Sequence, residues 1–145
     1  MRAGARGGAR WRTGMDKPNT IFLVDANPVS RHALWLQLTH SKRSFRLFGD
    51  ARSALAALER ETPALVVADL DLPDRDGVAF LAEVARRRPP VRTVLISGTE
   101  TPVGARLALQ DRIIDEIVGR PVDALDYAVR RLLREGWEAW LPIAV

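Results

Sequence analysis

Residues 64–77 read ALVVADLDLPDRDG: an apolar run that ends in an aspartate, followed by an acidic loop and a glycine. A run that is apolar at every position is typical of a strand covered on both faces, as in a parallel sheet. Gly77 opens a stretch with helical spacing that continues to residue 88, where two prolines end it. The stretch therefore predicts a strand, a loop and a helix, with Asp69 at the carboxyl end of the strand.

The same alternation of apolar run and helical stretch occurs five times between residues 20 and 135. The other strands are expected at 21–24, 44–48, 91–97 and 113–118, and the other helices at 28–40, 51–61, 101–111 and 122–135. Strands that alternate with helices predict an α/β fold with a doubly wound parallel sheet.

Two of the helices carry apolar residues at helical spacing, which predicts the face that each one buries. The expected stripe of the first helix comprises Val29, Ala33, Leu36 and His40. That of the last helix comprises Val122, Leu125, Val129, Leu132 and Leu133.

Chemically active residues stand where four of the predicted strands end. They are Asp25, Asp69, Ser97 and Arg120. The carboxyl ends of parallel strands share one edge of the sheet, where α/β folds place their ligands. A carboxylate can attack a phosphoryl group, while a cation and a hydroxyl stabilise the phosphoryl oxygens. Carboxylates also supply the oxygen ligands that Mg²⁺ prefers.

Composition narrows the classes of protein further. The chain has 145 residues, which suits one domain, and no cysteine, which excludes disulfides and thiol nucleophiles. His32 and His40 are eight residues apart and make a poor metal site. Residues 1–20 carry the whole net charge of +4, so the remaining chain is neutral and a nucleic-acid-binding body is not indicated.

The two ends of the chain differ from the predicted domain at 20–135. Residues 1–19 are rich in Gly, Ala and Arg and predict a disordered basic tail, within which Met15 could be the true start. They contain no apolar run of an export signal, so we expect a cytoplasmic protein, with an organelle transit peptide as the alternative. Residues 136–145 form an apolar tail with two tryptophans, which either packs back on the domain or docks on a partner.

Four segments in order resemble the receiver domain of two-component response regulators. They are FLVDANP at 22–28, DLDLPDRDG at 69–77, ISG at 96–98 and GRP at 119–121. The resemblance covers about residues 20–135. It implies a flavodoxin-like (βα)5 fold with five parallel strands in the order 2-1-3-4-5.

The resemblance also implies roles for the residues at the strand ends. Asp69 matches the phosphoacceptor, and Ser97 matches the hydroxyl residue that contacts the phosphoryl group. Asp25 matches an acidic ligand of Mg²⁺, which Asp69 and the backbone carbonyl of Asp71 would complete. Arg120 stands in the place of the family's lysine.

Three positions depart from the family pattern. Ala26 replaces the second acidic residue, which predicts a weaker Mg²⁺ site because charge count tunes such sites. Arg120 keeps the positive charge, but a planar guanidinium is not a point charge. Ile117 replaces the aromatic residue of the fifth strand, so a rotating ring that reports phosphorylation is missing.

The resemblance implies a stand-alone receiver in a phosphorelay, acting as a switch and not as a metabolic enzyme. It would take a phosphoryl group from a phosphohistidine on a sensor kinase or phosphotransfer protein. It would then change how its last strand and helix bind a downstream protein. The alternative is a receiver-like interaction module that works without phosphorylation, as Ala26, Arg120 and Ile117 suggest. We expect neither a membrane nor a nucleic acid among the partners.

Overall fold

The computed structural model describes residues 19–39, 42–87, 91–98, 100–122 and 124–135. The predicted C-terminal tail and, apart from Asn19, the predicted N-terminal tail lie outside the described residues, as does His40.

Five strands and five helices alternate along the described chain, as the sequence predicts. The strands are β1 (Thr20–Val24), β2 (Ser44–Phe48), β3 (Leu65–Asp69), β4 (Arg92–Ser97) and β5 (Glu116–Gly119). The helices are α2 (Pro28–Leu38), α3 (Ala51–Leu58), α4 (Gly77–Ala85), α5 (Val103–Gln110) and α6 (Leu125–Glu135).

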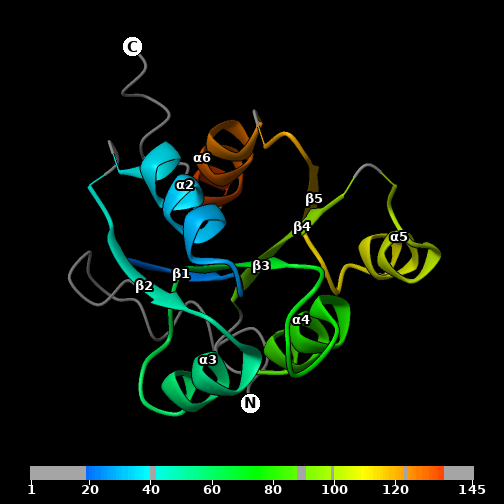
Figure 1. Ribbon diagram of the computed structural model, residues 1–145, viewed down its shortest axis with the longest axis horizontal. Helices are drawn as coiled ribbons and strands as arrows, with labels where there is room; N and C mark the ends of the chain where they lie inside the picture. Colours follow the sequence, from blue (N-terminus) through cyan, green and yellow to red (C-terminus); the bar gives the residue numbers. More distant parts are fainter. Residues whose placement is uncertain (1–18, 40–41, 88–90, 99, 123, 136–145) are drawn as a thin grey trace.

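All strand pairs are parallel, and the strands lie in the order β2-β1-β3-β4-β5. Helices α2 and α6 cover one face of the sheet, and α3, α4 and α5 cover the other (Figure 1). The predicted doubly wound fold and the strand order implied by the family resemblance are both confirmed.

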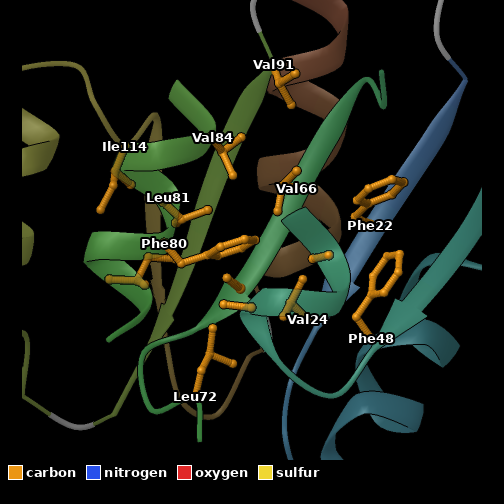
Figure 2. Close-up of a cluster of buried hydrophobic side chains, with 14 of the residues drawn as sticks. Phe22, Val24, Phe48, Val66, Leu72, Phe80, Leu81, Val84, Val91 and Ile114 are labelled. Atoms are coloured by element: carbon orange, nitrogen blue, oxygen red, sulfur yellow. The ribbon is translucent and has the colours of Figure 1, made fainter. Parts of the chain in front are cut away.

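Two apolar clusters hold the layers together, one on each face of the sheet. Successive strand residues point to opposite faces, so Phe22 and Val24 join the cluster beneath α3, α4 and α5, while Ile21 and Leu23 join the one beneath α2 and α6. Figure 2 shows the first cluster, in which Phe80 of α4 packs over the middle of the sheet. Burial on both faces explains why β1 and β3 are apolar at nearly every position and why β4 is apolar from Val94 to Ile96.

Short polar side chains start three of the helices. The side chains of Asn27, Asp50 and Asp76 accept hydrogen bonds from the first backbone N–H groups of α2, α3 and α4. Such caps satisfy donors that lack a partner within the helix. Pro28 occupies the first turn of α2, where its missing N–H costs nothing.

The predicted stripe of α2 is wrong, whereas that of α6 is confirmed apart from Val122, which precedes the helix. In α2 the residues facing the sheet are Leu34 and Leu38, while Val29 and Leu36 are 78% and 55% exposed. The helix carries apolar residues on more than one side, so spacing alone allowed two faces. In α6 the buried positions include Leu125, Val129 and Leu132, all from the predicted stripe.

Candidate functional site

The parallel register brings the predicted site residues to one edge of the sheet. Val24 pairs with Ala68, so Asp25 and Asp69 are the next residues on two adjacent strands. Asp69 in turn pairs with Ile96 of β4, which places Ser97 one position further along. Gly119, which pairs with Ser97, leads into Arg120. The prediction that these four residues lie at one edge of the sheet is therefore confirmed.

Asp69 presents a partly accessible carboxylate at the end of β3. Its side chain is 14% exposed. Oδ2 accepts a hydrogen bond from the backbone N–H of Asp71 at 3.0 Å, and Oδ1 forms an ion pair with Arg120. Both oxygens are oriented, and the charge has a partner, while solvent still reaches the group. This is an arrangement suited to a nucleophile that must meet an external donor.

Asp25 is far more enclosed, with a side chain that is 4% exposed. Its Oδ1 accepts the backbone N–H of Asn27 at 2.9 Å, and its Oδ2 accepts the hydroxyl of Ser30 at 2.6 Å. Its backbone carbonyl accepts a hydrogen bond from Arg31 Nη1 at 2.6 Å. The buried carboxylate is thus compensated by hydrogen bonds, as a buried polar group must be.

Arg120 reaches from the end of β5 to both carboxylates. Its Nη2 contacts Oδ1 of Asp69 and lies 3.9 Å from Oδ2 of Asp25. Its Nη1 donates to the hydroxyl oxygen of Ser30 at 3.4 Å. The two ends of a guanidinium make this possible, because they carry separate donors in a rigid plane. The predicted pocket cation therefore lies between the two acids.

Ser97 is buried at the end of β4, and its hydroxyl donates to the backbone carbonyl of Glu100 at 3.2 Å. The hydroxyl is held within its own loop in this state. On the neighbouring strand, Ile117 pairs with Leu95 and packs against the cluster beneath α3, α4 and α5. The position of the family's aromatic switch is therefore filled by an aliphatic side chain that contributes to the core.

The loop after Asp69 is tied down at several points. Asp71 and Asp76 form a short antiparallel bridge, and the N–H of Gly77 donates to the carbonyl of Leu70 at 2.8 Å. Asp74 reaches across to α3, where its carboxylate accepts the N–H groups of Ala51 and Arg52. The loop that carries the candidate site is thus anchored both to α4 and to α3.

The residues present fit a divalent cation poorly. Asp25 and Asp69 supply two carboxylates at this edge, but the residue after Asp25, where the family has a further acid, is Ala26. Asp71 was expected to contribute only its backbone carbonyl. Among the residues that the structure describes, no three His, Cys, Asp or Glu side chains gather closely enough to hold a metal ion. The predicted set of Asp25, Asp69 and Asp71 remains a prediction.

Sequence reasoning missed two members of the site. Ser30 lies in the first turn of α2 and contacts both Asp25 and Arg120. Arg31, the next residue, is a second cation at the same edge, where only Arg120 was expected. A helix that starts beside a strand-end acid directs its first turn toward that acid, which is the signal that could have found both.

Comparison with known proteins settles the family. The sequence model of the response regulator receiver domain matches residues 21–125, which is most of the chain. The chain belongs to the response regulator receiver family. It is therefore a domain of two-component signal transduction, as the motifs at the strand ends indicate.

Individual relatives agree with this membership. The receiver is 29% identical over 126 residues to the "probable transcriptional regulatory protein TcrX" of Mycobacterium tuberculosis, covering 81% of this chain and 51% of that protein. It is 30% identical over 115 residues to a protein-glutamate methylesterase/protein-glutamine glutaminase of Pseudomonas savastanoi, covering 76% and 31%. Among solved structures, the signal receiver domain of an HD domain-containing protein from Pseudomonas fluorescens superposes with a TM-score of 0.71 at 25% identity, covering 85% and 97%.

The receiver spans about half or less of the length of these two curated relatives. They include a regulator and an enzyme, so the prediction that this chain is not an enzyme remains a prediction. Within the described part of the receiver, none of the helices combines the length and apolarity needed to cross a bilayer.

Proposed function

We propose that this receiver accepts a phosphoryl group on Asp69 from a phosphohistidine donor and thereby switches its contacts with another protein. The observation that carries the proposal is the partly accessible Asp69 carboxylate at the end of β3, held against the guanidinium of Arg120. Phosphoryl transfer requires mainly positioning and positive charge near the transferred oxygens. This edge of the sheet supplies both.

The transfer balances as a single displacement. A carboxylate oxygen of Asp69 attacks phosphorus, and the new O–P bond forms as the N–P bond to the donor imidazole breaks. The freed imidazole nitrogen takes a proton from solvent. Arg120 then faces phosphoryl oxygens in place of the carboxylate, and charge-assisted hydrogen bonds of this kind are among the stronger ones in proteins.

The phosphoryl group adds about −1.5 to −2 charge, which alters what holds Arg120. In the resting pocket Arg120 is shared among Asp69, Asp25 and Ser30. A more negative partner at Asp69 draws the guanidinium toward it and away from Ser30. Because Arg120 follows β5 directly and precedes α6, this shift acts first on the segment that joins them. Tyr127 of α6 is 66% exposed, and we propose that a partner protein binds this exposed side of α6.

The partners in this proposal are a sensor kinase or phosphotransfer protein as donor and a downstream protein as target. Receivers act between such proteins. The stand-alone role remains part of the proposal, as does the cytoplasm as its place of action.

Incubation with acetyl phosphate and Mg²⁺, followed by intact mass spectrometry, tests the proposal. We expect a gain of one phosphoryl group that hydroxylamine removes, since hydroxylamine cleaves acyl phosphates. Asp69→Asn abolishes the gain, because the amide is no nucleophile. Asp111→Asn, at the end of α5, is the matched control and leaves it unchanged. A wild-type chain that stays unmodified, or an Asp69→Asn chain that is still modified, contradicts the proposal.

A second candidate is an interaction module that works without phosphate. Ile117 favours it, since an aliphatic side chain that packs against the core stands where the family has the aromatic residue that reports phosphorylation. In that case the wild type and Asp69→Asn bind the same target with equal affinity, and acetyl phosphate changes neither.

A further inference from the structure

In the resting pocket a guanidinium lies beside both of the carboxylates that were predicted to hold a metal ion. Arg120 Nη2 contacts Asp69 and lies 3.9 Å from Oδ2 of Asp25. The guanidinium therefore occupies the space between the two carboxylates that would hold a cation. A divalent ion entering this space meets a fixed positive charge at close range, which opposes its binding.

The oxygens of Asp25 are also engaged. Each accepts a hydrogen bond, one from the Asn27 backbone at 2.9 Å and one from the Ser30 hydroxyl at 2.6 Å. Ser30 additionally accepts from Arg120, so its hydroxyl joins the buried acid to the cation. These bonds orient the carboxylate toward protein donors. A hard cation would have to compete with them for the same lone pairs.

The pocket also lacks the second acidic residue of the family pattern, at position 26. Ala26 follows Asp25 and is exposed, and its side chain is a methyl group that offers no oxygen ligand. Charge count and ligand number decide how tightly a site holds a hard cation. The missing carboxylate and the guanidinium placed beside both remaining acids each weaken the binding of a divalent cation.

We propose that Arg120, positioned by Ser30 and Asp25, takes the place of the divalent cation, so that the resting receiver does not hold Mg²⁺ at this site. The resting pocket is a metal-free network of Asp25, Ser30, Arg120 and Asp69. This inference concerns the unphosphorylated chain. It stands or falls independently of whether Asp69 is phosphorylated.

Titration of the unphosphorylated, ¹⁵N-labelled full chain with Mn²⁺ tests the inference, because a bound paramagnetic ion broadens nearby amide resonances. In the wild type, we expect no saturable, selective broadening of the Asn27, Leu70 and Asp71 amides at low millimolar Mn²⁺. Arg120→Gln combined with Ala26→Asp removes the competing charge and restores the acid. This double variant binds Mn²⁺ more tightly by about tenfold or more, and Mg²⁺ displaces it.

The matched control is Arg75→Gln, which removes the same charge from an exposed position in the loop after β3. It leaves the Mn²⁺ titration as in the wild type, and the dispersion of the spectra reports that each variant is folded. Saturable wild-type binding in the sub-millimolar range that Mg²⁺ reverses overturns the inference. An Arg120→Gln, Ala26→Asp chain that binds no better than the wild type also overturns it, because Arg120 then does not exclude the metal.

Discussion

Gly77→Ala is the substitution for which the structure predicts the sharpest loss of stability. Gly77 begins α4 directly behind Asp69. A Cβ built on it lies 2.3 Å from the carbonyl oxygen of Asp69 and 2.9 Å from Cα of Leu70. Both neighbours are backbone atoms, so no side chain can rotate away. The start of α4 and the end of β3 must separate by roughly 1 Å to reach ordinary contact distance.

The size of the effect follows from three contributions. Overpacking of a tight site costs about 1–3 kcal/mol. The separation also weakens the hydrogen bond from the Gly77 N–H to the Leu70 carbonyl, a contribution of roughly 0.5–1.5 kcal/mol. Alanine restricts the unfolded chain and returns about 0.4–1 kcal/mol. The expected net loss in the free energy of unfolding is therefore about 2 kcal/mol.

Urea unfolding followed by circular dichroism measures this loss. With a slope of about 2 kcal/mol per molar urea for a chain of this size, the midpoint falls by roughly 1 M. Gly104→Ala is the matched control, since Gly104 lies in α5 with nothing within 4 Å of its added Cβ. That substitution stabilises by several tenths to about 1 kcal/mol through helix propensity. A Gly77→Ala midpoint within about 0.2 M of the wild type, with an unchanged slope, would refute the packing argument.

Two further substitutions test the loop and the buried polar groups. Asp74→Ala removes the acceptor of two α3 backbone N–H groups and lowers the free energy of unfolding by about 1 kcal/mol at neutral pH. Partial burial alone raises the pKa of Asp74, but the N–H groups of Ala51 and Arg52 and the charge of Arg75 outweigh it and lower that pKa. In urea unfolding, the difference in the free energy of unfolding between the wild type and Asp74→Ala therefore has its full size above pH about 4. It shrinks as the pH falls through the lowered pKa of Asp74, because the carboxylate is then protonated in the folded wild type. A difference that does not change with pH would contradict this account. Thr93→Val leaves the Ile113 carbonyl without the Thr93 hydroxyl and costs about 1–3 kcal/mol by the same assay, while the Asp115 N–H keeps its 3.0 Å bond to the backbone carbonyl of residue 93; no loss would show that water replaces the hydroxyl.

The sequence predicts the elements of this fold because each one follows a strong local rule. Apolar runs covered on both faces mark β1, β3 and β4, and proline or capping residues mark the helix starts. The order of the strands in the sheet does not follow from such local rules. It came from the family resemblance, since alternation alone implies parallel strands without saying which are neighbours.

The face that α2 buries could not be predicted for a physical reason. Its sequence offers Leu34 and Leu38 on one side and Val29 and Leu36 on others, and spacing does not rank them. The loop that precedes α2 sets the orientation of the helix and so decides which of its sides faces the sheet. Asp25 and Asn27 set that turn through their hydrogen bonds.

The candidate site was predictable to the extent that it depends on strand ends. Asp25, Asp69 and Ser97 follow from parallel register, because a residue that ends a strand lies at the shared edge. Ser30 and Arg31 did not follow, because both require the orientation of α2 relative to Asp25. The contact of Asp74 with α3, which anchors the loop beside the site, requires that two segments far apart in the chain meet.

Ala26 and Arg120 read as two unrelated departures from the family pattern, but the structure makes them parts of one arrangement. Losing the second acid removes a negative charge and a metal ligand from the pocket. A guanidinium in place of an ammonium adds a second set of donors, which lets one side chain contact Asp69 and Ser30 together. With Asp25, Asp69, Arg31 and Arg120 charged, the two acids and the two guanidinium groups at this edge sum to a net charge of about zero without any metal. The need for a divalent cation is therefore smaller than with a full acidic set. A single reversion therefore restores only half of the metal site, and both must change together for the pocket to hold a divalent ion.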